Sequence, residues 1–192
     1  TDLPLPDVSY TDITVKTTVR NLLNEEKEAT VEGNIAGTVF STKVTVPAKS
    51  EVPVKIDGIR IDNPELWMPN GYGEQNLYNM SLDCKLGDTL SDSRNIRFGV
   101  REMSYELTVD SPAEKGIRIE YKPLEHSSLG TIFDNRMLRS ALPGVHVPSL
   151  YPEVNVKDLD VIPDDGMGPY LVIKVNGVRI FCRGGNWGMD DM

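Results

Sequence analysis

The stretch "DITVKTTVR" at residues 12–20 decides the fold that this sequence predicts. Ile13, Val15 and Val19 alternate there with charged and polar side chains. Because successive side chains of a strand point to opposite faces, this alternation is typical of a strand with one buried face. The same pattern recurs along the first part of the chain, at residues 29–35, 40–46, 52–56, 78–86, 96–100 and 103–109.

These runs are short and evenly spaced, and no convincing helical pattern interrupts them. Their arrangement predicts an immunoglobulin-like antiparallel β-sandwich over residues 1–109. We interpret Asp57-Gly58 as turn chemistry at the end of the fourth run. The inward parity of the apolar residues shifts between Val100 and Met103, which indicates a bulge or a break between them.

The remaining residues divide into two parts. Residues 110–168 have weak periodicity apart from one short strand at 117–121, and we expect an irregular linker or insertion. Residues 169–192 contain two alternating runs joined by Asn176-Gly177, a pair that is typical of a type I′ hairpin turn. The predicted fold class is therefore all-β: an immunoglobulin-like antiparallel β-sandwich with a long irregular excursion and a C-terminal β-hairpin.

The charge of the chain narrows its classes of partner. The 192 residues carry a formal net charge of -9. An acidic surface disfavours nucleic acid and anionic membranes as partners, and it suits neutral or cationic ligands. No apolar run approaches the roughly 18 residues that are needed to span a bilayer. We therefore expect no nucleic acid partner and no membrane partner.

The cysteines and histidines give no sign of a metal centre. Cys84 and Cys182 fall at strand positions without metal-ligand spacing, and we expect two partly buried free thiols. A disulfide between them stays an open alternative, because its presence cannot be deduced from sequence. His126 and His146 lie without a companion ligand cluster. The sequence therefore predicts no metal and no organic cofactor.

Three stretches, taken in order, resemble glycoside hydrolase family 2. The first, "NPELWMPNGYGEQNLYNMSL" at residues 63–82, looks like the family's Asn-Pro-x-Leu-Trp-x-Pro-x-Gly-x-Gly loop. The second, "RFGVREMSY" at residues 97–105, resembles the strand that ends the family's second domain. The third, "VNGVRIFCRGGNW" at residues 175–187, is similar to the hairpin that leads into the family's catalytic barrel.

The last residues narrow the resemblance to one branch of the family. The stretch "GGNWGMDDM" at residues 184–192 is most similar to the β-mannosidase and exo-β-glucosaminidase branch. It departs from that branch where Gly188-Met189 replaces the common Ile-Pro. Members of the family look like a jelly-roll domain, then an immunoglobulin-like sandwich, then a (β/α)₈ barrel. The resemblance thus implies that residues 169–192 form the hairpin and the first strand of a truncated barrel.

The activity that the resemblance implies is retaining hydrolysis of β-mannosides or related β-linked sugars. Such enzymes need two carboxylic acids about 5–5.5 Å apart, and in this family both are glutamates on later barrel strands. We therefore expect no catalytic residue in this chain, which would be inactive alone and would serve as a spacer. The adjacent pairs Asp164-Asp165 and Asp190-Asp191 are poor substitutes, because neighbours on a strand point to opposite faces.

The candidate substrate-binding residues are Asn186, Trp187 and Asp190. Side chains at the C-terminal end of a barrel strand face the active site, so Trp187 would stack on a sugar while the other two hold hydroxyls. The alternative is that Trp187 packs in a core and the aspartate is solvated. Trp67 and Tyr72 pose a similar choice between a sugar platform and a plug at one end of the sandwich, and we favour the plug.

The resemblance also implies partners and a location. The carbohydrate substrate would bind the intact enzyme, and the sandwich would pack on the jelly-roll domain and on the barrel. The protein would be periplasmic or secreted. A rival hypothesis is a free-standing immunoglobulin-like carbohydrate-binding or adhesion module. It explains the sandwich and the acidic surface, but it leaves the hairpin and "GGNWGMDDM" without an explanation.

Overall fold

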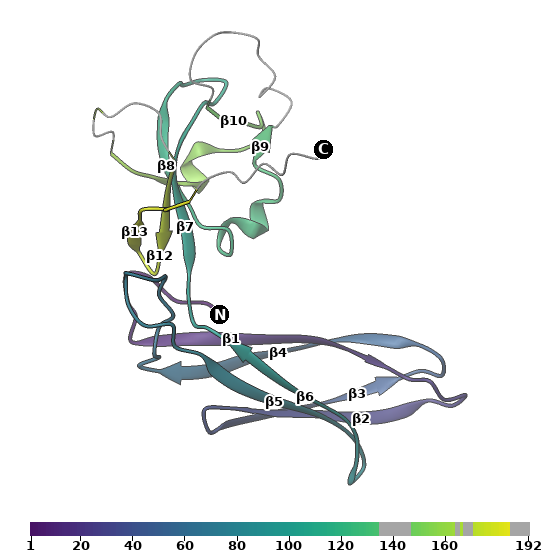
Figure 1. The fold of residues 1–192 in the computed structure, drawn as a ribbon. Helices are drawn as coiled ribbons and strands as arrows, with labels where there is room; N and C mark the ends of the chain where they lie inside the picture. Colours follow the sequence, from purple (N-terminus) through teal and green to yellow (C-terminus); the bar gives the residue numbers. More distant parts are fainter. Residues whose placement is uncertain (135–146, 164–165, 167–170, 185–192) are drawn as a thin grey trace, which may run out of the picture. The chain divides into compact units, whose positions relative to one another are not determined.

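The computed structural model describes residues 1–134, 147–163, 166 and 171–184. The chain divides into two compact units, Thr1–Glu102 and Met103–Met192, and Figure 1 shows both as ribbons coloured along the sequence. Each unit has its own sheets and its own buried hydrophobic cluster. The described residues of both units are mainly antiparallel strands, so the predicted all-β class is confirmed.

The first unit is a sandwich of two antiparallel sheets. One sheet pairs β1 (Tyr10–Arg20) with β4 (Glu51–Asp62). The other sheet has the strand order β3-β2-β5-β6. Its strands are β2 (Lys27–Ile35), β3 (Thr38–Val46), β5 (Tyr78–Leu86) and β6 (Thr89–Phe98). Figure 1 shows these two layers of strands facing each other, which confirms the predicted β-sandwich.

The core of the sandwich lies where the alternating apolar residues of the two sheets meet. Ile13 and Val15 of β1 join a buried cluster that includes Val31 and Ile35 of β2. Full burial of such a side chain stabilises the fold by about 1.5–3 kcal/mol. The alternation that predicts the strands therefore also supplies the contact between the sheets.

The predicted turn at Asp57-Gly58 is wrong. Strand β4 continues through both residues, and Ile59 beyond them lies in the core. The register shifts here, because two residues of β4 lie opposite the single residue Thr14 of β1. Gly58 has φ +77°, and Thr14 donates a 2.8 Å hydrogen bond to the Asp57 carboxylate. The segment is a β-bulge, which uses the same positive φ as a turn and so has turn-like composition.

The structure ends the first unit at Glu102 rather than at the predicted residue 109. Strand β7 (Met103–Val109) pairs with β8 (Ile117–Tyr121) and with β12 (Leu171–Val175), all in the second unit. The boundary falls where the sequence shows its parity shift. A chain that leaves one sheet for another acquires new neighbours, so its inward parity starts again.

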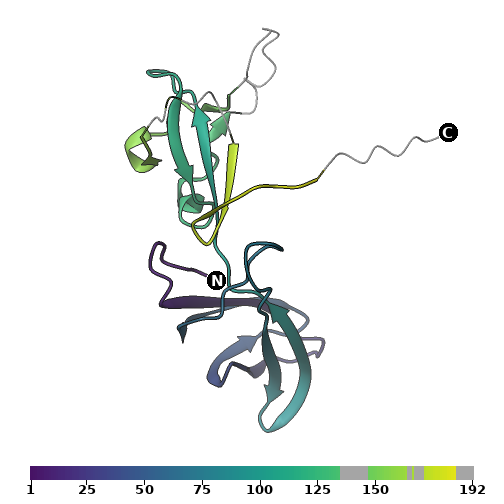
Figure 2. The ribbon, with the colours of Figure 1, turned by 60° about the vertical axis from the view of Figure 1, so that its left-hand side comes forward.

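The second unit contains a five-stranded sheet with the order β11-β8-β7-β12-β13. Its edge strands are β11 (Asp160–Val161) and β13 (Val178–Ile180). Figure 2 shows β12 and β13, in yellow, beside the teal strands of this sheet. Every neighbouring pair of strands in it is antiparallel.

The predicted irregular linker at residues 110–168 forms part of this unit's core. Besides β8 and β11, its described residues include η1 (His126–Leu129), β9 (Phe133–Asp134), β10 (Ser149–Leu150) and η3 (Val156–Asp158). Ile119 of β8 packs in a buried cluster with Ile132, Leu150 and Leu159. Strand β8 is the short strand predicted at residues 117–121, whereas the other elements span only two to four residues each, too few to leave a periodic pattern in the sequence.

The predicted C-terminal hairpin is confirmed. Strands β12 and β13 are joined by Asn176 and Gly177, whose φ angles are +51° and +79°. Positive φ at both central residues is the signature of a type I′ turn. Strand β13 ends at Ile180. The expected barrel strand beyond it stays a prediction.

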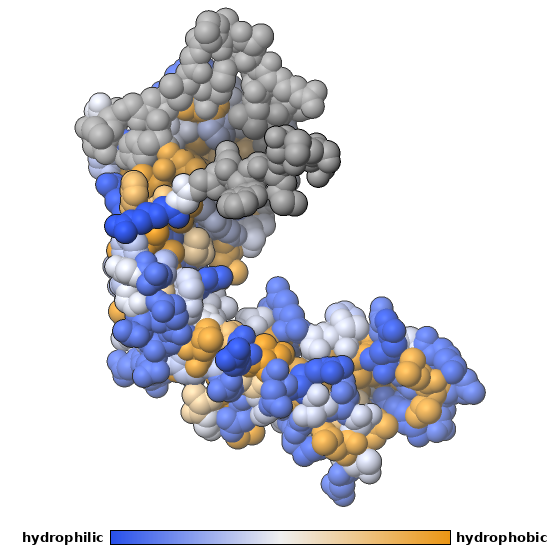
Figure 3. Space-filling view, viewed as in Figure 1, coloured by the Kyte–Doolittle hydropathy of each residue, from blue (hydrophilic) through white to orange (hydrophobic). Residues whose placement is uncertain are grey.

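The surface of the sandwich carries scattered apolar side chains. Leu22, Val39 and Leu90 are each more than half exposed, and Figure 3 shows hydrophobic patches between hydrophilic ones on this unit. Packing of this surface on further domains stays a prediction. No helix in the described part of the chain is long and apolar enough to cross a membrane.

Both cysteines are free thiols, so the open alternative of a disulfide between them is excluded. Cys84 of β5 is partly buried as predicted, and burial raises the pKa of its thiol, with a smaller contribution from the nearby Asp92. Cys182 is exposed rather than partly buried. It lies past the end of β13.

Candidate functional site

The three predicted substrate-binding residues, Asn186, Trp187 and Asp190, lie outside the described residues. The aspartate pairs at 164–165 and 190–191 lie outside them as well. In the sequence, β13 and residues 181–184 are the described residues that come just before the three predicted ones. The site that can be built from described residues is the sheet face that carries β13.

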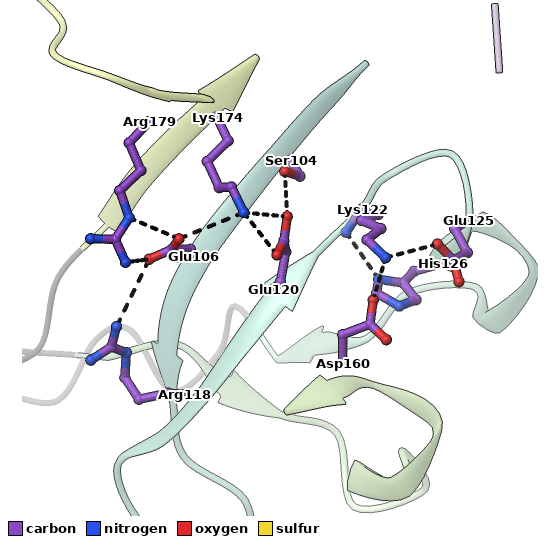
Figure 4. A network of polar contacts seen from close by, with 10 residues as sticks. All are labelled: Ser104, Glu106, Arg118, Glu120, Lys122, Glu125, His126, Asp160, Lys174 and Arg179. Carbon is purple, nitrogen blue, oxygen red and sulfur yellow. Dashed lines mark hydrogen bonds and ion pairs between the residues drawn. The ribbon is translucent and has the colours of Figure 1, made fainter. Parts of the chain in front are cut away.

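Alternation places polar side chains of four strands on one face of the second sheet. Glu106 of β7 is the register partner of Glu120 on β8, and Lys174 of β12 is the partner of Arg179 on β13. Figure 4 shows their side chains pointing toward one another across the sheet. We call this set the charged face; its members are Ser104, Glu106, Arg118, Glu120, Lys174 and Arg179.

Glu106 is the centre of the charged face. Its carboxylate accepts hydrogen bonds from Arg179 at 3.0 Å from Nε and 2.7 Å from Nη2. The Lys174 ammonium lies 3.7 Å from it and the Arg118 guanidinium 4.0 Å. Only 6% of the Glu106 side chain is exposed. A carboxylate so far removed from water depends on these cations, because an unpaired buried charge costs several kcal/mol.

Glu120 is the second carboxylate of the charged face. Both of its oxygens lie 2.9 Å from the Lys174 ammonium, and Ser104 donates a 2.8 Å hydrogen bond to it. Burial by itself raises the pKa of this carboxyl, but the hydrogen bonds from Lys174 and Ser104 outweigh burial and lower the pKa. Lys174 lies near both carboxylates and so links the two halves of the network.

A smaller polar cluster surrounds Lys122 just past the end of β8. Its ammonium lies 2.7 Å from Asp160 and 3.3 Å from Glu125, and the hydrogen bond to Asp160 raises the lysine pKa. The backbone N–H of Lys122 donates a 3.1 Å hydrogen bond to His126 Nδ1. The buried His126 ring also stacks on Tyr121 at 5.5 Å between centroids. These contacts give His126 a structural role.

The charged face lacks the acid that retaining hydrolysis needs. A catalytic acid has its pKa raised so that it keeps a proton near neutral pH. The pKa of Glu120 is lowered instead, and both oxygens of Glu106 accept hydrogen bonds from Arg179. Among the described residues, no group of three or more His, Cys, Asp and Glu could hold a metal ion. The chemistry of this face is charge pairing that positions strands.

The loop at residues 63–77 packs on the end of the sandwich. A Cβ added at Gly99 would lie 2.7 Å from the Trp67 side chain, so only glycine leaves room for that tryptophan. The Arg101 guanidinium stacks over the Trp67 ring at 4.6 Å from its centroid. These contacts favour the plug for Trp67. Tyr72 of the same loop is 38% exposed, so its role stays a prediction.

The charged face was not predicted from the sequence, although the sequence contains a signal for it. In β7, β8 and β12 the positions between apolar residues carry Glu106, Arg118, Glu120 and Lys174, with both signs of charge. Such positions usually face water. Opposite charges on strands that the fold pairs are the signal that could have identified them as partners.

The fold and the site together define an immunoglobulin-like sandwich joined to a charged, ion-paired sheet. The family model "Glycosyl hydrolases family 2" matches residues 4–101, which is the sandwich almost in full. This chain belongs to glycosyl hydrolases family 2.

The curated relatives of this chain are named either as exo-β-D-glucosaminidases or as β-mannosidases. An exo-β-D-glucosaminidase from Amycolatopsis orientalis is 33% identical over 117 residues, which cover 61% of this chain and 11% of that protein. A mannosylglycoprotein endo-β-mannosidase from Lilium longiflorum is 24% identical over 78% of this chain and 10% of its own length. The chain thus spans only about a tenth of the length of these relatives.

Solved structures agree with this placement. The crystal structure of an Amycolatopsis orientalis exo-chitosanase matches 59% of this chain and 13% of its own, with 32% identity and a TM-score of 0.51. A β-D-mannosidase from Dictyoglomus thermophilum matches 97% of this chain and 16% of its own, with a TM-score of 0.52. At 22% identity the second match shows the fold alone.

Proposed function

We propose that this chain is a non-catalytic part of a retaining family 2 glycoside hydrolase that cleaves β-mannosides or related β-linked sugars. The observation that carries the proposal is the family match over residues 4–101, combined with the small share of each relative that the chain spans. A piece of that size supplies the sandwich and the adjoining charged sheet. The two catalytic glutamates come from a later part of the same protein.

The relatives favour a β-D-glucosaminide as the related sugar. Three curated relatives are named exo-β-D-glucosaminidase, and the two others are named as mannosidases. A glucosamine unit carries an amine that takes up a proton. The net charge of -9 on this chain suits such a cationic substrate.

The chain itself serves as a spacer in this proposal. The sandwich packs on a jelly-roll domain and on the barrel, and its exposed apolar side chains suit such packing. The hairpin leads toward Asn186, Trp187 and Asp190, which contact the sugar. The intact enzyme acts in the periplasm or outside the cell.

The first test is to read the coding frame beyond the codon for Met192. We expect several hundred further codons with alternating strand and helix patterns. The full-length protein should then be assayed on aryl β-D-glucosaminide, β-mannoside and β-galactoside, with the 192-residue chain as the inactive control. Cleavage of either of the first two sugars well above the third supports the proposal. A stop codon directly after Met192, or turnover by the chain alone, contradicts it.

The rival hypothesis is separated by a binding measurement. Glucosamine, mannose and their oligomers are titrated onto the 192-residue chain by calorimetry. We expect no saturable binding, because the sugar site needs the barrel. Saturable binding to this chain would favour an independent carbohydrate-binding module instead.

A further inference from the structure

Strand β13 is short and largely exposed. It spans three residues and pairs with β12 at the edge of the sheet. Val178 and Arg179 are exposed and Ile180 is only partly buried. The next residue, Phe181, exposes 74% of its surface. Three ladder pairs and a tight turn fix a strand poorly, because edge strands fray and slip when one face is not anchored.

The anchor of β13 is an ion pair that crosses a strand. Arg179 reaches from β13 over β12 to Glu106 on β7, which is not a neighbour of β13 in the sheet. Both contacts come from one guanidinium to one carboxylate, so the pair has the bidentate geometry that fixes direction as well as distance. Figure 4 shows Glu106 between Arg179, Lys174 and Arg118.

Burial makes this contact specific. The Glu106 side chain is 6% exposed, while the Arg179 side chain is 61% exposed. The sheet therefore fixes the position of the carboxylate, and the exposed arginine side chain takes the position that lets it pair with this carboxylate. A slip of β13 by one residue would turn Arg179 to the other face of the sheet and break both hydrogen bonds. The buried charge thus selects a single register for the hairpin.

We propose that Glu106 is a positioning residue, which clamps the β12–β13 hairpin through Arg179 and so sets where the chain after Ile180 enters the catalytic domain. The proposal rests on the proposed function, because it takes that chain to lead into the sugar site. Glu106 touches no substrate. It acts through Arg179, the register of β13 and the direction of the segment that follows.

The clamp itself is tested in the 192-residue chain by amide hydrogen exchange. Glu106→Gln keeps the shape of the side chain and removes its charge. We expect the amides of residues 172–180 to exchange at least tenfold faster, while those of β2 and β5 stay unchanged. Arg179→Lys keeps the charge and loses the bidentate fork, so it should reproduce most of the effect. The control is Glu28→Gln, which removes an exposed ion pair with Lys43 on the sandwich.

The consequence for catalysis is tested in the full-length enzyme with the same variants. Glu106→Gln and Arg179→Lys should lower kcat/KM at least tenfold on the sugar that the wild type cleaves. The measurement is made at a temperature where circular dichroism shows the variants fully folded. A merely structural role would leave kcat and KM of the folded enzyme unchanged. Glu106→Asp, which keeps a carboxylate, should recover part of the loss.

The outcomes separate this proposal from the function on which it rests. If the wild-type full-length protein cleaves none of the sugars, the proposed function fails, and the exchange data still decide whether the clamp exists. If the wild type is active and the hairpin amides of Glu106→Gln exchange as in the wild type, the clamp is overturned. Faster exchange with unchanged kcat and KM overturns the positioning role.

Discussion

The two units of this chain differ in how deeply their ion pairs are buried. The sandwich keeps its ion pairs outside: Lys43 and Glu28 lie 3.0 Å apart with 69% and 61% of their side chains exposed. The second unit has exposed pairs too, but it also has pairs that are largely shielded from water, such as Lys174 and Glu120, which lie 2.9 Å apart with 15% and 17% of their side chains exposed. Exposed pairs contribute little to stability, whereas a buried pair is costly to break. The sandwich is therefore held by its apolar core, and the second sheet depends on its charges as well.

The largest expected effect tests what the two units share. Ile35 in the sandwich and Ile119 in the second unit both have 0% of their surface exposed. Replacing either by alanine leaves a cavity, and we expect a loss of about 2–5 kcal/mol in the free energy of unfolding. Residue-resolved hydrogen exchange should show the loss in the strands of the unit that carries the substitution. A loss below about 1 kcal/mol at either site would mean that its cluster is not a packed core.

The next effect tests where the units differ. Lys174→Met leaves the buried Glu106 and the largely buried Glu120 short of a cation, so we expect a loss of about 3 kcal/mol in the second unit. The matched change on the sandwich, Lys43→Met, should cost well under 1 kcal/mol, because that pair is exposed. Urea unfolding of both variants measures the difference. Equal losses at the two sites would remove the contrast between the units.

Lowering the pH should also affect the stability of the two units differently. The pKa of Glu120 is held below its usual 4.5, so its stabilisation is present above that value and is lost as the pH falls through the lowered pKa. We expect the second unit to lose stability below about pH 4.5, with a shallower slope in Glu120→Gln. In the sandwich, the hydrogen bond from Arg60 lowers the pKa of Asp12, but that pair is exposed.

Salt separates these two contributions to the acid response. At 1 M salt the Debye length is about 3 Å, which screens exposed pairs far more than buried ones. The acid response of the second unit should therefore persist in 1 M NaCl while that of the Asp12–Arg60 pair fades. Unfolding curves over pH 2–6 at low and high salt make the measurement. A second-unit response that disappears in salt would contradict burial of the Glu120–Lys174 pair.

Sequence patterns predicted the sandwich better than the second unit, for a physical reason. Strands such as β1 bury one face and expose the other, so alternation alone identifies them. In β7 the side chains of Ser104, Glu106 and Thr108 are buried as well as Val109. When both faces are buried, a polar residue no longer marks the face toward water, and the pattern is misread. The turn predicted at Asp57-Gly58 was wrong for a different reason: β-bulges and turns favour the same residue types.

The candidate site was predictable only in part. The Asn176-Gly177 turn is encoded by two adjacent residues, so the sequence located the hairpin. The clamp joins Glu106 to Arg179, 73 positions further along the chain. The clamp exists because β7, β12 and β13 lie in one sheet. The sequence prediction assigned β7 to the sandwich, so it could not predict this strand order. Two charged residues far apart in the sequence can pair only if the fold brings their strands together. A single sequence does not show that strand order directly.

The smallest expected effect compares two hairpin turns, one in each unit. Asn176 joins β12 to β13 with φ +51°, and Ala36 joins β2 to β3 with the same φ of +51°. An alanine there is strained by about 1 kcal/mol or more, since its Cβ crowds the carbonyl, whereas asparagine tolerates this region. Ala36→Asn should therefore stabilise the sandwich by about 0.5–1 kcal/mol, and Asn176→Ala should destabilise the second unit by at least as much. Thermal unfolding of both variants measures the two signs. If Ala36→Asn destabilised the sandwich, turn strain would not be what distinguishes the hairpins, and packing around Ala36 would have to account for its presence.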